Sequence, residues 1–310
     1  MIIHKSINNL NIKKPVVTIG MFDGVHNGHK MIFSSLKDYA KKINGESIVL
    51  SFWPHPRMIF EGNASVRLLT TMDEKLNLLE KEEIDHFVLI PFNREFANIS
   101  YKSFVKEILY KKLKINTIII GFDHQFGKNR EGDFNKLTEL SKVYRFNVQK
   151  LDAQIIENEK VSSSIIRNSL NEGNIEMANK YLGYIYNFSG YVVEGKKNGR
   201  AIGYPTANLF IKEPYKLIPG SGVYAVTAIM EDKNFKGMMN IGYRPTIVED
   251  NKQKSIEVHL FDINKDLYGK NITINVLKKV RNEEKFSSVE TLKSQIKEDE
   301  VYIRKFLSEH

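Results

Sequence analysis

The first half of the chain alternates short apolar runs with segments of helical periodicity, and this order constrains the fold more than any other feature. Runs with the composition of buried strands span residues 16–20, 46–52, 86–92, 116–122 and 145–151. Apolar side chains at helical spacing lie between them, for example in 73–83 and 100–113. This order predicts an α/β fold with a parallel sheet covered by helices. Gly20, Phe52 and Gly121 end three of the strands, so we expect them at the ligand-binding edge of that sheet.

A different pattern begins after Leu170. Short strand-like segments separated by turn residues occupy 188–195, 221–230, 236–242, 254–262 and 271–280. Such a series predicts an antiparallel barrel or sandwich. The last segment, 287–307, combines a serine N-cap with a helical apolar stripe. We therefore predict two domains, 1–183 and 184–310, the second of which ends in a helix.

Composition restricts the classes of partner. The 310 residues carry a formal charge of +9, of which +5 falls in residues 1–180 and +4 in 181–310. Nucleic-acid-binding proteins usually concentrate their charge, so we expect small anionic ligands such as nucleotides and no nucleic-acid partner. The absence of cysteine excludes disulfides, thiolate metal sites and cysteine nucleophiles, and it fits a cytoplasmic protein. No apolar run has the length of a membrane span, so we expect no membrane partner, and a monomer or weak homo-oligomer.

The segment Gly20–Lys30, GMFDGVHNGHK, connects a strand to a helix. Gly28 and His29 fall where the helix begins, and its free N–H groups and dipole make that end an anion site. His26 lies three residues before His29, so both imidazoles can converge on the α-phosphate of a nucleoside triphosphate. Asp23 is placed to orient a histidine or to reach a metal through water. A turn with two surface histidines is the alternative, and the FDGV sequence before them argues against it.

Three further segments are predicted to reach the same edge of the sheet. In FWPHP, 52–56, two prolines stiffen the loop around His55. In GFDHQFGKNREGD, 121–133, glycines allow close approach, Asp123 is an acceptor, and aromatic side chains can sandwich a ring. In VSSSIIR, 161–167, serines and an arginine can hold phosphate oxygens. Taken singly, the first two fit a plain turn or loop about as well, and the third fits a helix cap better.

In this order and spacing, the four motifs resemble the adenylyltransferase half of bacterial bifunctional riboflavin kinase/FAD synthetases, a nucleotidyltransferase group marked by a His-x-Gly-His turn. The resemblance covers the first half nearly end to end and implies a Rossmann-like domain. It gives His26 and His29 catalytic roles and implies ATP contacts for Gly20, Phe22, Asp23, His26, Gly28, His29, Asp123, Ser163, Ser164 and Arg167. It places two residues near the flavin or the transferred phosphate, His55 and Phe126. Two residues depart from the family pattern: His124 replaces phenylalanine, and Ser164 replaces threonine but keeps the hydroxyl.

Two motifs of the second half carry chemistry of their own. In GRAIGYPTANL, 199–209, Thr206 and Asn208 point to one face of an extended chain, and their oxygens suit Mg²⁺ held together with ATP phosphates. In SIEVHLFD, 255–262, alternation turns the aliphatic residues inward and Glu257 outward, where it can act as general base for a substrate hydroxyl. Standing alone, the first motif is better explained as a proline turn entering a strand. A solvated strand face explains the second equally well.

Together with GSGVYAV, NIGYRPT and RNEEKFSSVETLKSQI, these motifs resemble the riboflavin kinase module, a small antiparallel β-barrel with a C-terminal helix. The resemblance implies a Mg²⁺ and ATP site at Gly199, Gly203, Thr206 and Asn208, a base at Glu257, and flavin contacts at Arg281 and Phe286. The expected protein is a bifunctional enzyme of flavin cofactor synthesis. It phosphorylates riboflavin to FMN with ATP and Mg²⁺, and it adenylylates FMN to FAD with release of pyrophosphate.

Two other interpretations stay open at this point. The first half alone permits adenylylation of another phosphate-bearing acceptor, such as phosphopantetheine or a nicotinamide nucleotide, and the kinase-like second half argues against it. The second is a flavin- or RNA-binding regulator with a degenerate site, against which the complete set of site residues and the dispersed charge argue. Incubating the protein with riboflavin, ATP and Mg²⁺ and separating the flavins distinguishes these interpretations.

Overall fold

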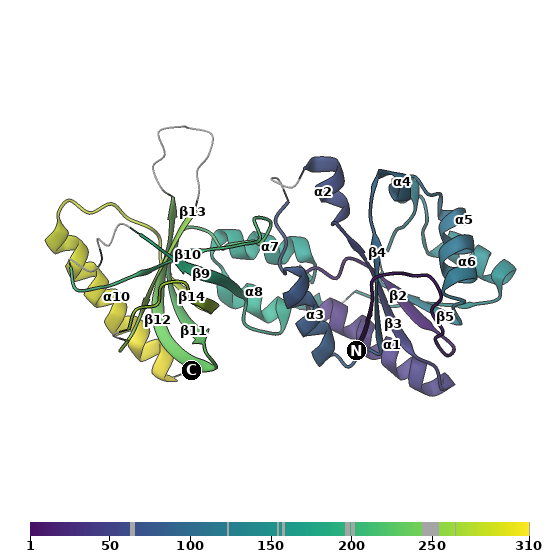
Figure 1. Ribbon diagram of the computed structural model, residues 1–310, viewed down its shortest axis with the longest axis horizontal. Helices are drawn as coiled ribbons and strands as arrows, with labels where there is room; N and C mark the ends of the chain where they lie inside the picture. Colours follow the sequence, from purple (N-terminus) through teal and green to yellow (C-terminus); the bar gives the residue numbers. More distant parts are fainter. Residues whose placement is uncertain are drawn as a thin grey trace. The chain divides into compact units, whose positions relative to one another are not determined.

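Six parallel strands form the sheet of the N-terminal half in the computed structural model of the chain (Figure 1). The structure describes residues 1–309 except 63–65, 123, 154, 157, 158, 196–198, 200, 201, 244–253 and 264. In the order β1-β4-β3-β2-β5-β6, the strands are β1 (Ile2–His4), β4 (His86–Pro91), β3 (Ser47–Trp53), β2 (Val16–Ile19), β5 (Thr117–Ile120) and β6 (Asn147–Lys150). The predicted parallel sheet is therefore present, with β1 as an additional edge strand.

Helices connect these strands and cover both faces of the sheet. They are α1 (Asn27–Ile43), α2 (Pro56–Glu61), α3 (Met72–Lys81), α4 (Arg94–Ala97), α5 (Tyr101–Ser103) with its π-helical continuation η1 (Phe104–Lys112), the 3₁₀ turn η2 (Lys128–Arg130) and α6 (Phe134–Tyr144). A short hairpin follows, β7 (Ile155–Ile156) and β8 (Glu159–Lys160). The helix predicted over 100–113 is thus present, largely in π-helical form.

Alternation along the strands divides the core into two layers. Val17 and Ile19 of β2 pack in one cluster with η1 and α6, whereas Val16 packs on the other side with α1 and α3. The strand β3 divides in the same way, with Ile48 on the first side and Val49 on the second. Because both faces are buried, these strands read as continuous apolar runs in the sequence.

The second half contains two helices, α7 (Ser163–Glu172) and α8 (Ile175–Leu182), followed by a closed barrel. Its strands, in the order β10-β13-β12-β11-β14-β9, are β10 (Ala207–Phe210), β13 (Lys254–Leu260), β12 (Lys233–Tyr243), β11 (Gly222–Met230), β14 (Asn271–Arg281) and β9 (Asn187–Val193). Each neighbouring pair is antiparallel. The structure therefore selects the barrel over the sandwich.

The terminal helix α10 (Val289–Glu309) packs against the outside of the barrel. Ile303 and Leu307 are buried against apolar residues of β11 and β12, including Val223 and Met238. The start of α10 has the predicted serine cap, because the Ser288 Oγ accepts the Thr291 N–H at 3.2 Å.

Contacts divide the chain into two compact units, Met1–Ser163 and Ser164–His310. In the second unit, α8 is tied to the barrel by Asn179, which donates to the Val276 carbonyl at 3.1 Å and accepts the Tyr186 N–H at 2.7 Å. Helix α8 therefore belongs structurally with the barrel. The predicted folding boundary between residues 183 and 184 stays a prediction, which the experiment on two fragments below addresses.

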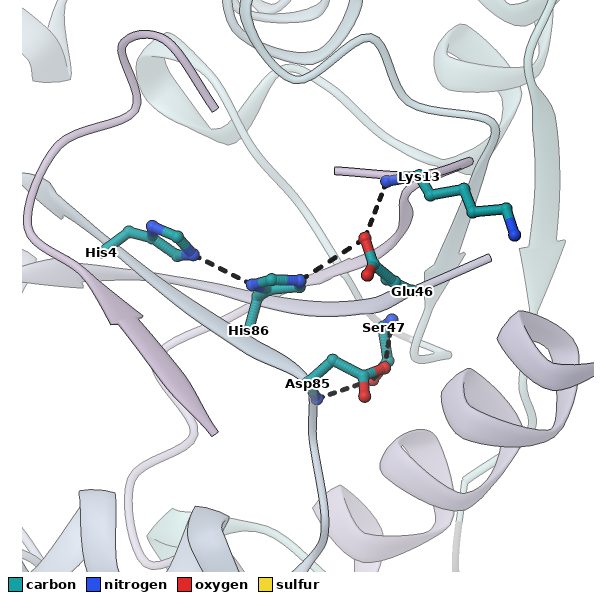
Figure 2. A network of polar contacts seen from close by, with 6 residues as sticks. All are labelled: His4, Lys13, Glu46, Ser47, Asp85 and His86. Atoms are coloured by element: carbon teal, nitrogen blue, oxygen red, sulfur yellow. Dashed lines mark hydrogen bonds and ion pairs between the residues drawn. The ribbon is translucent and has the colours of Figure 1, made fainter. Parts of the chain in front are cut away.

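A chain of polar contacts ties the edge strand β1 to the sheet (Figure 2). His4 Nε2 lies 3.0 Å from Nδ1 of His86, the first residue of β4. The other nitrogen of His86, Nε2, faces a carboxylate oxygen of Glu46 at 3.6 Å, and that oxygen accepts the Lys13 N–H at 2.7 Å. A proton on His86 Nε2 is favoured by this carboxylate, so we assign Nδ1 as the acceptor and His4 as the donor. In this assignment the Nε2–H group of His4 donates to Nδ1 of His86.

Acid is expected to weaken this contact. Burial, and after it the neighbouring His86, lower the pKa of His4 below its usual 6.5. The unfolded chain then binds protons more readily than the folded one, so stability is lost as the pH falls below about 6.5. In scanning calorimetry, the melting temperature of the N-terminal unit should fall less between about pH 7 and pH 5 in His4→Gln than in the parent protein. An equal fall in both proteins would contradict the assignment.

Candidate active sites

The turn after β2 brings the predicted histidines to the start of α1. His26 is the extended N-cap residue, with φ −73° and ψ 171°, and the helix begins at Asn27. Gly28 and His29 therefore lie in the first helical turn, as the sequence predicts. The His26 carbonyl accepts the N–H groups of His29 and Lys30 at 2.7 and 3.0 Å. At Gly28 a Cβ atom would lie 3.3 Å from the His26 ring, so glycine leaves room beside the imidazole.

The turn itself is held in an unfavourable backbone conformation. Phe22 and Val25 have φ of 48° and 41°, although both are buried residues with bulky side chains. Such conformations cost free energy and persist where the surroundings impose them. Here the Asp23 carboxylate, 3% exposed, accepts the N–H groups of Leu69 at 2.9 Å and Thr70 at 3.2 Å. The structure thus shows Asp23 fixing the turn to a neighbouring segment, and its predicted contact with ATP, a histidine or a metal stays a prediction.

The two histidines form one stacked unit. Their ring centroids are 3.5 Å apart and their planes differ by 20°. Phe22 packs edge-on against His29, with centroids 5.2 Å apart, and Gly20 leaves space for the Phe22 ring. Burial, followed by the charges of His26 and Lys75, holds the pKa of His29 well below 6.5. At pH 7 the His29 imidazole is therefore neutral and offers one N–H donor.

The serines and arginine of the VSSSIIR motif are divided between the two units. Ser163, in the first unit, donates from Oγ to the Asp23 carbonyl at 2.9 Å. In the second unit, Arg167 Nη2 lies 3.4 Å from Ser164 Oγ on the same helix. The predicted roles of all three toward the triphosphate stay predictions.

The two residues predicted near the flavin lie in different surroundings. His55 caps α2, where its Nδ1 accepts the Arg57 N–H at 3.2 Å, so Nε2 carries the proton of the neutral ring. Phe126 is buried and stacks with His124, with centroids 5.9 Å apart and planes 22° apart. An aromatic ring is thus retained at 124, where the family has phenylalanine. The predicted adenosine contact, Asp123, lies outside the described residues.

A row of aromatic rings leads from Phe126 to the surface. Neighbouring centroids are 5.7, 6.2, 5.8 and 6.4 Å apart along Phe126, Phe104, Phe96, Phe92 and Phe60. Phe60 is 64% exposed, whereas Phe104 and Phe126 are buried. The row ends in an exposed aromatic surface suited to a flat ring.

The second unit contains a cavity of about 970 Å³ beside the barrel wall. Its walls come from the loop before β10, from β12 and β13, and from the segment that enters α10. The predicted residues that line it are Gly199, Thr206, Glu257, Arg281 and Phe286. Gly203 and Asn208, predicted for the same site, are not among its lining residues, although Asn208 lies next to it on β10.

Strand register brings the polar groups of this cavity together. Asn208 of β10 lies opposite Glu257 of β13, which in turn lies opposite Asn240 of β12. Opposed residues of antiparallel strands project on the same side of a sheet. The aliphatic neighbours of Glu257 are buried, whereas Glu257 itself is half-buried, so the predicted alternation is present. Thr206 Oγ1 donates to Glu257 Oε2 at 3.2 Å.

Arg281 connects the barrel to α10. Its Nε and Nη2 donate to the Asp299 carboxylate at 3.0 and 2.8 Å, and Asp299 is 4% exposed. Gln295 also donates to this carboxylate at 3.1 Å. The Arg281 guanidinium lies over the Phe286 ring, 5.6 Å from its centroid. Arg281 therefore fixes one wall of the cavity, and its predicted contact with the flavin stays a prediction.

Three residues at these sites cannot be recognised as functional from the sequence alone. Asn240 is part of the NIGYRPT motif, but only the register places it beside Glu257. Asp299 is one of many charged residues in the last helix, and only its burial against Arg281 singles it out. Lys75 lies in an ordinary amphipathic segment, yet it is 2% exposed beside the histidine turn.

Comparison with known proteins decides the family. Residues 9–165 match the family model for FAD synthetase, and residues 182–307 match the model for riboflavin kinase. The chain belongs to the bifunctional riboflavin kinase/FMN adenylyltransferase family. A protein of that name from Buchnera aphidicola subsp. Acyrthosiphon pisum is 40% identical over 297 residues, which cover 95% of this chain and 94% of the relative. The Escherichia coli K12 protein of the same name is 37% identical, with 94% and 92% covered.

One solved structure has this fold along the whole chain. A crystallised protein from Streptococcus pneumoniae is 29% identical, with a TM-score of 0.88 and coverage of 98% of this chain and 99% of that one. It carries the name macrolide-efflux protein, which describes that protein alone. Within the residues that the structure describes here, no helix has both the length and the apolar composition of a membrane span.

Membership of the family confirms the predicted activities and their order along the chain. The C-terminal domain phosphorylates riboflavin to FMN, and the N-terminal domain adenylylates FMN to FAD. Both reactions use ATP. The parallel sheet and the antiparallel barrel with its terminal helix confirm the predicted fold class.

Proposed function

We propose that Glu257 is the general base of the riboflavin kinase reaction. The observation that carries this assignment is its carboxylate at the cavity wall, hydrogen-bonded to the Thr206 hydroxyl at 3.2 Å. The 5′-hydroxyl of riboflavin is a weak nucleophile until its proton is removed, and a positioned carboxylate accepts that proton. The hydroxyl oxygen then bonds to the γ-phosphorus of ATP, the bond to the bridging oxygen breaks, and ADP leaves.

A Mg²⁺ ion fits beside this base. Mg²⁺ prefers oxygen ligands and is usually shared with substrate phosphates. The Thr206 hydroxyl and the Asn208 amide supply neutral oxygens, and the pairing of Asn208 with Glu257 places both next to the carboxylate. These two residues would hold the ion, which when bound neutralises phosphate charge.

In the N-terminal domain, we assign His26 and His29 to the α-phosphate of ATP. An oxygen of the FMN phosphate attacks the α-phosphorus, and pyrophosphate leaves. Charge that builds on the phosphate oxygens is stabilised by the neutral His29 N–H and by the positive end of the α1 helix dipole. The stacked His26, 3.5 Å away, holds the plane of the His29 ring. This preorganised stack supports a role for the two histidines in adenylyl transfer rather than in packing the core.

For FMN itself, we propose a site along α2. His55 caps the start of this helix, and the exposed Phe60 lies in its last turn. The isoalloxazine ring is flat and largely apolar, which suits the exposed end of the aromatic row. The buried Phe126 lies at the other end of the row, and its predicted place near the flavin or the transferred phosphate stays a prediction.

The cellular location that we propose follows from the substrates. Both reactions take small molecules, and ATP is supplied in the cytoplasm, where we place the enzyme. We also propose that the enzyme is a monomer or weak homo-oligomer and that it has no nucleic-acid or membrane partner.

Replacing Glu257 by glutamine tests the base. Glu257→Gln keeps the shape of the side chain and removes the proton acceptor, so FMN formation should fall by roughly 10²–10⁴-fold. FAD formation from supplied FMN serves as the internal control and should be unchanged. The measurement is chromatographic separation of riboflavin, FMN and FAD. A kinase rate within a few-fold of the parent would reduce Glu257 to a solvated strand residue.

Replacing His29 by alanine tests the histidine turn. His29→Ala removes one preorganised donor, so FAD synthesis should fall by about two to three orders of magnitude while FMN accumulates from riboflavin. His4→Ala is the matched control, because it removes an imidazole of the same unit from the edge strand β1, which β4 and β3 separate from β2. The assay is also started with FMN. If the variant then makes FAD at the parent rate, adenylyl transfer occurs elsewhere.

Two fragments test the modularity of the chain. Residues 184–310 begin at the predicted boundary, whereas residues 164–310 begin at the compact unit and include α8. Both should phosphorylate riboflavin, and neither should make FAD. The shorter fragment loses the Asn179 contacts with the barrel, so its melting temperature should be lower by about 5 °C or more. A folded 164–310 fragment without kinase activity would show that the domains depend on each other.

A further inference from the structure

Lys75 occupies a position that is unfavourable for a lysine. It is 2% exposed and lies near the N-terminus of α3. A buried ammonium group loses its hydration, and the positive end of the helix dipole opposes a cation there. Burial accordingly lowers the pKa of Lys75, against the opposing effect of Asp23. A lysine that is buried at this cost is expected to serve the contacts that its ammonium group makes.

The ammonium group of Lys75 contacts the turn that precedes α1. Its Nζ donates a 2.7 Å hydrogen bond to the carbonyl of Met21. Met21 immediately precedes Phe22, which is the first residue of this turn with a positive φ. Lys75 therefore holds the first part of the turn. Leu69 and Thr70, which precede α3, hold Asp23 in the middle of the same turn.

Lys75 also acts on His29 through its charge. After burial and His26, the positive charge of Lys75 contributes to the lowered pKa of His29. Bound ATP would bring several negative charges and favour protonation of the imidazole. A fixed cation beside the turn opposes that change and keeps His29 a neutral donor.

We propose that Lys75 is a positioning residue of FMN adenylyl transfer, which holds the Gly20–Val25 turn in the conformation that presents His26 and His29 to ATP. The proposal rests on the roles assigned above to the two histidines. Lys75 acts through the Met21 carbonyl and through its charge. Its loss should therefore lower turnover at saturating substrate more than it weakens substrate binding.

The test compares three variants of the full chain. Lys75→Met should lower kcat for FAD formation from FMN by roughly 10- to 100-fold, because small displacements of catalytic groups have effects of that order. The KM for FMN should stay within about threefold of the parent value. Lys75→Gln retains an N–H donor for the Met21 carbonyl and should lose less. Lys81→Met, an exposed lysine of the same helix, is the matched control and should keep the parent rate.

A second measurement separates positioning from folding. In ATP-free protein, NMR titration of the His29 ring, assigned with His29→Ala, should show a higher pKa in Lys75→Met than in the parent. This shift does not depend on activity. A parent rate together with an unchanged titration in Lys75→Met would overturn the proposal. Loss of the cooperative unfolding of the N-terminal unit in both Lys75 variants would also overturn it, because Lys75 would then be required for folding. A parent rate in His29→Ala would instead refute the histidine roles.

Discussion

The order and register of strand pairing place the proposed reactive groups of both domains. In the barrel, Glu257 faces the cavity because Asn208 and Asn240 lie opposite it on the two neighbouring strands. A slip of one residue would turn this carboxylate into the apolar interior, where an unpaired charge is very costly. In the parallel sheet, β3, β2 and β5 are adjacent and run in one direction, so their carboxyl ends share an edge. The turns that follow these strands therefore meet there.

The two reactions need different chemistry, and the two sites differ accordingly. The nucleophile of the kinase reaction is a hydroxyl, which must lose a proton, and the proposed base, Glu257, lies beside the Thr206 hydroxyl in the barrel. The nucleophile of the second reaction is a phosphate oxygen, which is already ionised near neutral pH. The N-terminal site therefore needs donors for developing charge rather than a base. In the role that we propose for it, a neutral His29 at a helix N-terminus supplies such a donor.

Preorganisation of the histidine turn depends on buried polar groups. Phe22 and Val25 are held at positive φ, and the contacts of Asp23 and Lys75 with neighbouring segments offset that cost. Each of these charged side chains is almost fully buried. The role that we propose for this arrangement is the geometry that it imposes on the histidines.

The sequence by itself determined the two fold classes, their order and the motifs, because apolar periodicity, turn residues and motif spacing are local properties. It predicted a helix start at Gly28 and His29, next to the observed start at Asn27, and the outward position of Glu257 from the same local rules. Only the tertiary structure showed that Asn240 faces Glu257, that Asp299 holds Arg281, and that Lys75 is buried beside the histidine turn. Each of these facts joins residues far apart in the chain. A lysine in an amphipathic helix looks solvated until the packing of that helix is known, and for that physical reason the supporting residues emerged only from the fold.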